Sequence, residues 1–203
     1  MEASEKQREG SAMDQAGGTE SGTIDSVLAH NRAFVAGGEF ARYATDKYPD
    51  KKLAVVSCMD TRLTELLAAA LVLKNGDAKI IKVAGAEVAH PFGSVMRSLL
   101  IAVCELGVED IMIVAHTNCG AQHMSGKEMV ANMERLGVSA ERIEFARHCG
   151  IDFDKWLAGF GDTEEAVRKS VDMVANHPVM PPHVRVIGFI MDSDTGELTQ
   201  VNC

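Results

Sequence analysis

The sequence has no apolar run long enough to cross a membrane and no block of basic residues. A membrane-spanning helix needs about 20 predominantly apolar residues, and no segment of this 203-residue chain supplies them. The N-terminus also lacks the hydrophobic core of a signal peptide. Acidic residues outnumber basic ones by 29 to 20, which gives a net charge of −9 and disfavours nucleic-acid binding. We therefore expect a cytoplasmic protein with no membrane partner and no nucleic-acid partner.

The cysteines do not form the even, regularly spaced set of a disulfide framework. Five are present, at positions 58, 104, 119, 149 and 203. Their odd number and irregular spacing suit free thiols in a reducing compartment, where thiolates are available as metal ligands. Cys104 lies in an apolar stretch and is expected in the core, because free cysteine is among the most buried residue types.

The first 22 residues are poor in large apolar side chains and rich in Glu, Ser, Gly and Gln. This composition is typical of a disordered tail. No internal repeat follows, and the length of the chain is ordinary for one domain. The sequence therefore predicts a disordered tail over residues 1–22 and a single α/β domain over residues 23–203.

Short apolar runs in the remaining sequence have the length and composition of buried parallel strands. They cover residues 53–57, 79–83, 111–115 and 184–190. A turn at Asp194-Thr195-Gly196 leads into residues 197–201, which we expect to form a fifth, edge strand.

Helical patterns alternate with these strands. They cover residues 94–106, 127–136 and 163–175, and an earlier one at 23–48 is interrupted near Gly37. Thr163 is a candidate N-cap, with acidic residues in the first turn that follows it. The alternation predicts an α/β fold, with a mostly parallel central sheet of four strands plus the edge strand, flanked by helices.

Metal-binding side chains stand at the ends of two predicted strands. Cys58 directly follows the first strand, and His116 directly follows the third, with Cys119 three residues later. Ligands in open α/β sheets bind outside the carboxyl ends of strands, where the topology switches. If the first and third strands are neighbours, these three side chains converge. Two thiols and an imidazole suit zinc. A structural zinc takes four protein ligands, whereas here the fourth position falls to Asp60 or to water. A site of this kind is more typical of a catalytic zinc than of a structural one.

Asp60 and Arg62 follow Cys58 at intervals of two residues. An extended segment would therefore direct all three side chains to one side. A guanidinium beside a carboxylate forms a charge-assisted, often bidentate contact. Alone, this pair would be read as a structural ion pair at a strand end. Its proximity to the candidate metal ligands favours a functional role.

The segments 58–62 (CMDTR) and 116–120 (HTNCG) together resemble the signature of the β-class carbonic anhydrases. The resemblance covers about residues 53–201. It implies an α/β zinc enzyme, a lyase (carbonate dehydratase), that reversibly hydrates carbon dioxide to bicarbonate and a proton. It also implies homodimers, which often pair into homotetramers. The predicted helix at 23–48 has an apolar face that would cover a neighbour, in this chain or in a second subunit.

The resemblance also implies roles for individual residues. Cys58, His116 and Cys119 would hold one zinc ion per chain, and Asp60 and Arg62 would form the catalytic dyad. Arg62 would keep Asp60 ionised and away from the metal, so that Asp60 accepts a hydrogen bond from zinc-bound hydroxide. In a closed state, Asp60 would instead take the fourth position on zinc and expel water.

One departure from the family pattern follows the second predicted strand. Family members usually carry Arg-Asn-Ala-Gly there, whereas this chain has Lys82-Val83-Ala84-Gly85. Lysine keeps the charge but loses the planar fork of arginine, and valine loses an amide. We assign Ala84 and Gly85, together with Gly120 after the last ligand, to a substrate pocket that suits a small linear molecule.

The ligand set predicts how activity depends on pH. Two thiolates cancel the charge of a zinc dication, whereas three histidines leave it intact, and in a three-histidine site the bound water ionises near a pKa of about 7. A neutral zinc–dithiolate core should acidify its water less. We therefore expect activity to rise toward alkaline pH.

Turnover also needs a route by which the proton leaves the site. His123 lies four residues after Cys119, and an unperturbed histidine titrates in the useful range. It is the candidate proton shuttle, and the alternative is an ordinary surface or packing histidine.

Three functions are compatible with this site. Hydration of carbon dioxide leads. The departure at Lys82-Val83 leaves room for hydrolysis of carbonyl sulfide or carbon disulfide on the same zinc. The third option is a catalytically silent zinc-binding paralogue, held closed by Asp60.

Overall fold

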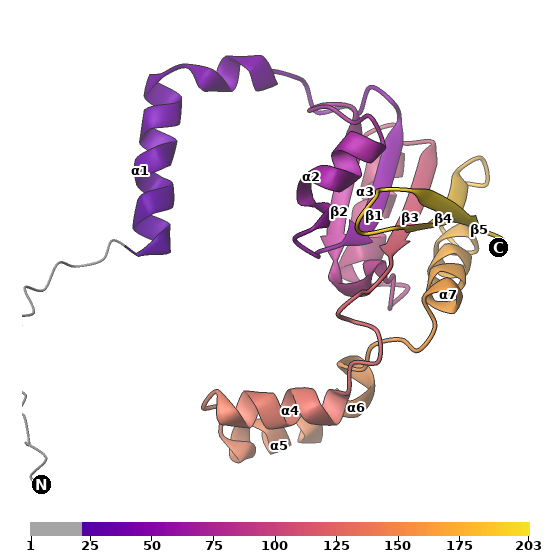
Figure 1. Cartoon of the computed structure of the whole chain (residues 1–203). Coiled ribbons are helices and arrows are strands. Elements are labelled where there is room, and N and C mark those ends of the chain that lie inside the picture. The colour runs from indigo at the N-terminus through magenta and orange to yellow at the C-terminus, as the bar shows by residue number, and fades with distance from the viewer. Residues whose placement is uncertain (1–21) are drawn as a thin grey trace, which may run out of the picture. The chain divides into compact units, whose positions relative to one another are not determined.

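The computed structural model of the chain describes residues 22–203 and divides after Ala44 into two units (Figure 1). The tail predicted over residues 1–22 lies outside the described residues, apart from Gly22. The division falls inside residues 23–203, over which the sequence predicts one domain. None of the helices in the described residues is long and apolar enough to cross a membrane.

The first unit consists of two helices. The α-helix α1 (Thr23–Ala36) is followed by the 3-10 helix η1 (Glu39–Tyr43). They are separated at Gly37-Gly38, where the sequence predicted an interruption, and Gly38 has a left-handed backbone with φ of 69°. No side chain of α1 is buried within the described residues.

A five-stranded sheet organises the second unit, in the order β2-β1-β3-β4-β5. The strands are β1 (Leu53–Cys58), β2 (Ala78–Val83), β3 (Asp110–His116), β4 (Arg185–Met191) and β5 (Leu198–Val201). The first four are parallel, and β5 pairs antiparallel with β4 at one edge. The predicted fold class, a mostly parallel sheet of four strands with a fifth edge strand, is confirmed.

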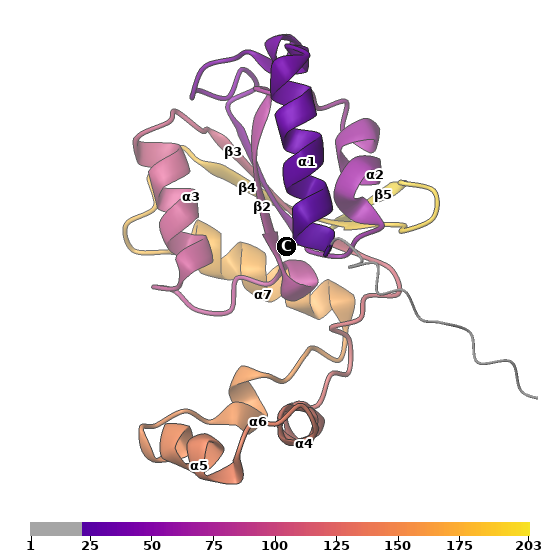
Figure 2. The same ribbon diagram turned by 90° about the vertical axis from the view of Figure 1, so that its left-hand side faces the viewer.

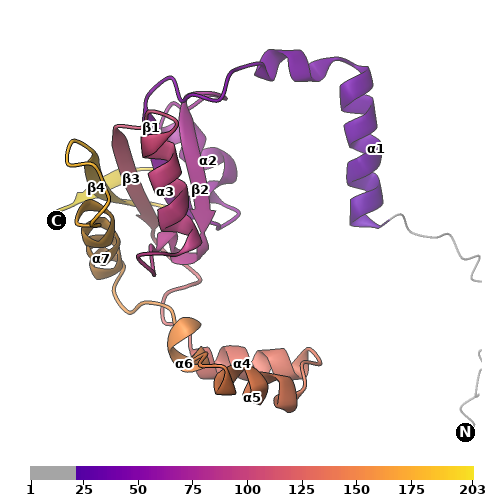
Figure 3. The ribbon, with the colours of Figure 1, turned by 180° about the vertical axis from the view of Figure 1, so that it is seen from behind.

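Helices cover both faces of this sheet (Figures 2 and 3). The helix α2 (Leu63–Ala70) lies on one face, and α3 (Ser94–Cys104) and α7 (Thr163–Ala175) lie on the other. The core between the layers is built mainly from the central strands, in which residues 54–58 of β1 are all buried. Continuous burial of this kind is what a parallel strand between two helical layers requires.

Two expectations about this region are wrong. Thr163 begins α7 but does not cap it; the cap is Asp162, whose carboxylate accepts a hydrogen bond from the backbone N–H of Glu165 at 2.7 Å. Cys104 ends α3 with its side chain exposed, because it falls on the solvent side of a helix whose buried face includes Leu99 and Val103. Apolar neighbours in sequence therefore did not make it a core residue.

A small helical cluster lies between β3 and α7 in the chain. It contains α4 (Gly126–Arg135), which was predicted within one residue at each end, and α5 (Ala140–His148) and α6 (Phe153–Trp156), which were not. It has its own core of Val130, Ile143 and Phe153. A short 3-10 helix, η2 (Ala84–Ala86), follows β2 and contacts β1.

Candidate metal centre

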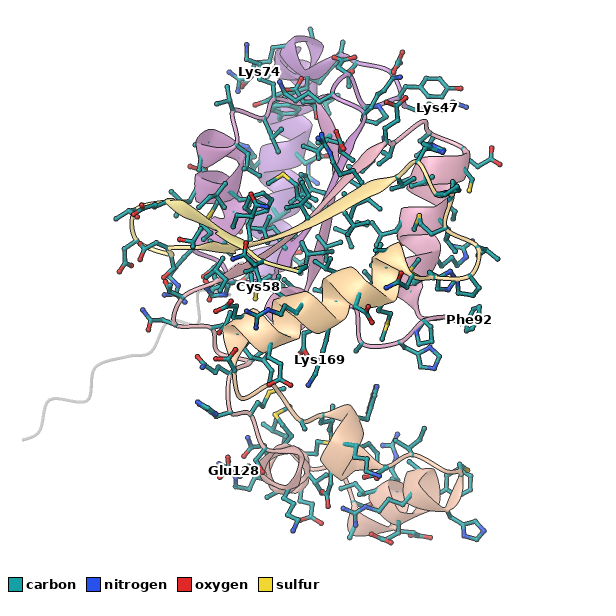
Figure 4. All side chains as sticks on the ribbon, turned by 90° about the vertical axis from the view of Figure 1, so that its right-hand side faces the viewer. Lys47, Cys58, Lys74, Phe92, Glu128 and Lys169 are labelled. Atoms are coloured by element: carbon teal, nitrogen blue, oxygen red, sulfur yellow. The ribbon has the colours of Figure 1, made fainter. Side chains whose placement is uncertain are left out.

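The candidate ligands lie where the central strands end. Cys58 is the last residue of β1 and His116 the last residue of β3, and these strands are hydrogen-bonded neighbours. Their carboxyl ends therefore lie side by side at one end of the sheet, and Figure 4 labels Cys58 there. Cys119 is brought to the same place by the loop after β3, in which Asn118 adopts a left-handed conformation with φ of 53°. The convergence predicted from strand order is what the structure contains.

The three side chains form a compact group of soft donors. The ligand atoms of Cys58, His116 and Cys119 all lie within 4.8 Å of one another, and all three residues are buried. The two Sγ atoms are 3.8 Å apart. A search of the described residues for three or more His, Cys, Asp or Glu side chains close enough to hold a metal ion finds this group.

The orientation of His116 supports metal binding. Its Nδ1 lies 2.8 Å from the carbonyl oxygen of Thr117, so Nδ1 carries the proton and donates it there. Nε2 then presents a lone pair, yet this buried atom has no hydrogen-bond partner in the structure. Leaving a buried polar atom unpaired is unfavourable. A metal ion between the two thiols would satisfy it, and a ring fixed through its other nitrogen is typical of metal-binding histidines.

The electrostatics of the group favour one ionised thiol. Burial opposes ionisation of Cys58, but the adjacent His116 and the backbone N–H groups of Asp60 and Gly85 outweigh it and lower the Cys58 pKa to about 7. Cys58 in turn raises the pKa of His116 through their side-chain contact. Burial raises the pKa of Cys119, and the negative charge of a neighbouring Cys58 thiolate raises it further. A dication would remove that repulsion and hold both thiols ionised.

Asp60 and Arg62 form a bidentate ion pair beside the group. Arg62 donates from Nε to Oδ1 at 3.0 Å and from Nη2 to Oδ2 at 2.8 Å, and its backbone N–H also donates to Oδ1. These bonds hold the pKa of Asp60 far below its usual range. Asp60 Oδ2 lies 3.8 Å from His116 Nε2, but it is not part of the compact ligand group. The carboxylate therefore stands next to the ligands while Arg62 holds it.

Arg62 makes further contacts with Ser193 and with the backbone of Asn118. Its Nη1 donates to Ser193 Oγ at 3.2 Å, and its Nη2 donates to the carbonyl oxygen of Asn118 at 2.9 Å. Ser193 in turn contacts Thr117. Ser193 is 131 residues from Arg62 in the chain, and no spacing pattern in the sequence signals such a contact.

The predicted pocket residues behave differently from one another. Gly85 is buried with φ of 68°, and a Cβ there would lie 2.9 Å from Phe160 Cε1 and 3.2 Å from Glu87 Oε2. Glycine is therefore required at this position. Ala84 and Gly120 are exposed, and a Cβ on Gly120 would meet nothing within 4 Å. The left-handed residue of this loop is Asn118 rather than Gly120.

Lys82 has a definite structural role. Its Nζ donates to the carbonyl oxygens of Cys58 and Leu63, each at 3.1 Å. It thus connects the end of β1, where a ligand lies, to the first residue of α2. Burial lowers the pKa of Lys82.

His123 lies apart from the compact ligand group. Its side chain is exposed, its backbone is left-handed with φ of 60°, and its backbone N–H donates to the Phe160 carbonyl at 2.7 Å. The loop thus orients the backbone of His123 through Phe160 and leaves the imidazole open to solvent.

The sequence of the chain is similar to those of known proteins. A sequence model described as carbonic anhydrase matches residues 53–198. The chain is 46% identical over 175 residues to the Bacillus subtilis protein named "Putative carbonic anhydrase YtiB", which covers 86% of this chain and 94% of that one. It is 28% identical over 156 residues to a carbon disulfide hydrolase of Acidithiobacillus thiooxidans, over 73% of this chain and 76% of that one.

Among solved structures, the fold matches β-carbonic anhydrase isoform I from Trichomonas vaginalis with a TM-score of 0.80. The sequences are 31% identical, and the match covers 89% of this chain and 97% of the other. A carbon disulfide hydrolase structure matches with a TM-score of 0.65 at 24% identity, which concerns the fold alone.

Proposed function

The chain belongs to the β-carbonic anhydrase family, and on this basis we propose that it is a zinc enzyme that reversibly hydrates carbon dioxide to bicarbonate and a proton. The observation that carries the proposal is the compact Cys58, His116 and Cys119 group with an unpaired Nε2. Its donor set fits zinc, with three protein ligands and room for one more. Bound there, zinc would acidify a water molecule and so supply the nucleophile.

We assign the orienting role to Asp60. Its carboxylate is kept ionised by Arg62 and lies beside the ligand group. An ionised carboxylate accepts hydrogen bonds only, so Asp60 Oδ2 can accept a hydrogen bond from the attacking oxygen and leave a lone pair of that oxygen aimed at carbon dioxide. Arg62 also keeps Asp60 out of the ligand set. Release of this ion pair would let Asp60 become the fourth ligand, which is the closed state.

Two further parts of the site have proposed roles. Small residues, Ala84, Gly85 and Gly120, would border the pocket for a small linear substrate. His123 is exposed to solvent, which suits a group that passes protons to buffer. Replacing His123 with Ala should slow turnover in weak buffer, and added imidazole should restore it. A variant insensitive to buffer would remove His123 from the mechanism.

Assembly into a homodimer or homotetramer is part of the proposal. The apolar residues of α1 are exposed within the described structure, with Ile24 at 70% and Val27 at 57%. Burying such a face against a second subunit would be favourable. The five free thiols suit a reducing compartment, so we place the enzyme in the cytoplasm. Light scattering of the zinc-loaded protein would give the number of subunits.

Stopped-flow measurement of carbon dioxide hydration by zinc-loaded protein tests the function. We expect one zinc per chain and a rate that rises with pH, since two thiolates neutralise the charge of the dication. Cys58→Ser should lose zinc and activity together. Retention of zinc with no hydration above the buffer rate would instead favour a silent paralogue that Asp60 keeps closed.

Carbonyl sulfide and carbon disulfide are the alternative substrates. They are supported by the relatives named carbon disulfide hydrolase and by Lys82-Val83 at the departure from the family pattern. Sulfide release by the zinc-loaded protein, compared with carbon dioxide hydration by the same preparation, separates the two activities.

A further inference from the structure

The guanidinium of Arg62 is held from two sides. Its Nε and Nη2 face Asp60, and the remaining donors reach Ser193 Oγ from Nη1 and the Asn118 carbonyl from Nη2. The Arg62 side chain is 40% exposed, whereas Ser193 is 4% exposed. A buried hydroxyl therefore holds Nη1, the one guanidinium nitrogen that neither Asp60 nor Asn118 engages.

The Ser193 hydroxyl is itself rigidly placed. The backbone N–H of Ser193 donates to Thr117 Oγ1 at 3.0 Å, and the two hydroxyl oxygens are 3.2 Å apart. Thr117 follows the ligand His116, and its N–H donates to the Met191 carbonyl at the end of β4. Ser193 thus stands on a frame made by the ends of β3 and β4, the same frame that carries His116.

The side chain at position 193 must offer a hydrogen-bond acceptor to Arg62 Nη1. Arginine has donors and no acceptor, while a serine hydroxyl can accept from Arg62 and share a second hydrogen bond with Thr117. An alanine at position 193 would keep the backbone bond to Thr117 but offer Nη1 nothing. Water can reach the exposed guanidinium. Losing the Ser193 hydroxyl would therefore change the orientation of the guanidinium without leaving a buried charge unpaired.

We propose that Ser193 is a positioning residue that fixes the guanidinium of Arg62 and thereby keeps Asp60 outside the metal ligand set. This rests on the proposed function, in which Asp60 must orient water and not bind the metal. With Nη1 released, Arg62 can rotate out of its bidentate contact. Asp60 Oδ2, already 3.8 Å from His116 Nε2, is then free to approach the ligand group.

Three variants test the assignment in the full-length, metal-loaded protein. Ser193→Ala removes the hydroxyl, Ser193→Thr keeps it, and Thr195→Val is the matched control. Thr195 belongs to the same turn, where its hydroxyl bonds to Asp192 Oδ1 and not to Arg62. Each protein is loaded with Co²⁺ for visible absorption, which reports the type and number of ligands, and with Zn²⁺ for carbon dioxide hydration.

For Ser193→Ala we expect a shifted Co²⁺ spectrum, from entry of a carboxylate, and a kcat/KM lower by about tenfold, in keeping with the lower end of the effect of one hydrogen bond to a charged group. Ser193→Thr should restore both, and Thr195→Val should match the parent in both. In an Arg62→Ala background, Ser193→Ala should change neither quantity further, since Ser193 acts through Arg62.

An unshifted spectrum in Ser193→Ala overturns the assignment, as does an equal shift in Thr195→Val. Equal effects of Ser193→Ala with and without Arg62 would overturn it as well. The two proposals fail separately. Absence of hydration by the parent protein would refute the proposed function, while its Co²⁺ spectra would still decide the role of Ser193.

Discussion

At the scale of single residues, His116 illustrates how a local contact determines which atom can bind a metal. Its Nδ1 is engaged by the carbonyl of Thr117, the next residue, so Nε2 is the nitrogen left to bind a metal, and it has no hydrogen-bond partner in the structure. The contact depends on β3 ending at His116, so that the following carbonyl can turn back toward the ring. The position of His116 after a strand was readable from the sequence, but the choice of nitrogen was not.

Gly85 is the residue whose replacement should disturb the site most directly through sterics. In Gly85→Ala, a Cβ in a left-handed backbone would crowd Phe160 Cε1 at 2.9 Å and Glu87 Oε2 at 3.2 Å. We expect a loss of about 1–3 kcal/mol in the free energy of unfolding and weaker zinc binding, because the Gly85 N–H lies by the Cys58 thiol. Chemical denaturation and a chelator competition would measure these two effects.

The control for that prediction is Gly161→Ala. A Cβ on Gly161 would meet nothing within 4 Å, and its φ is outside the left-handed range. Its unfolding midpoint should stay close to that of the parent protein. Equal stability of Gly85→Ala and Gly161→Ala would show that the contact with Phe160 relaxes at no cost.

At the scale of elements, β2 braces the end of β1 through Lys82. The Lys82 ammonium joins the carbonyls of Cys58 and Leu63, and between these two residues lie Asp60 and Arg62. Lys82→Met would remove the donor and loosen this segment. We expect zinc affinity to fall by about tenfold, the lower end of the effect of losing contacts around metal ligands.

Lys79→Met in the same strand is the matched control for Lys82→Met. The Lys79 ammonium bonds to the Lys47 carbonyl, at the other end of the strand. Competition with a chromophoric chelator should give an unchanged zinc affinity for it. If both variants weaken zinc binding alike, the effect belongs to β2 as a whole rather than to the contact with Cys58.

The packing of α7 on β4 depends on Gly188. A Cβ at this position would overlap Val167 Cγ1 and lie 3.1 Å from Val171 Cγ2, both on α7. Gly188→Ala should therefore reduce the free energy of unfolding by about 1–3 kcal/mol. Adding Val167→Ala should recover part of that loss, since it removes the overlapping methyl group. Additive losses in the double variant, measured by thermal unfolding, would contradict this account.

At the scale of the whole molecule, the parts predictable from sequence were those set by strand order. Apolar runs predicted the strands, and ligands at the ends of adjacent parallel strands had to converge, as Cys58 and His116 do. Side-chain contacts between residues far apart in the chain were not predictable. Ser193 reaches Arg62 only because β4 ends beside β3. The short α2 was missed because its buried face consists of Leu63 and Leu67 alone.

Zinc should stabilise the whole protein, and more so as pH rises. Binding requires both thiols deprotonated and the imidazole neutral. Because the pKa of Cys119 is raised, zinc must displace its proton throughout the neutral range. Toward acid pH, zinc must also displace protons from Cys58, whose pKa is about 7, and from His116, whose pKa is raised. Affinity for zinc should therefore increase with pH, with the steepest slope below pH 7.

Thermal unfolding with and without zinc, at fixed total metal between pH 6 and 8, measures this dependence. Because a ligand present at about 1,000 times its Kd contributes about 4 kcal/mol, the zinc-induced rise in Tm should grow with pH as the affinity grows. Cys119→Ser should lose most of the increment, since a serine hydroxyl does not ionise in this range. A zinc increment that stayed constant with pH would mean that no ligand proton is displaced, and the thiols could not be the metal's ligands.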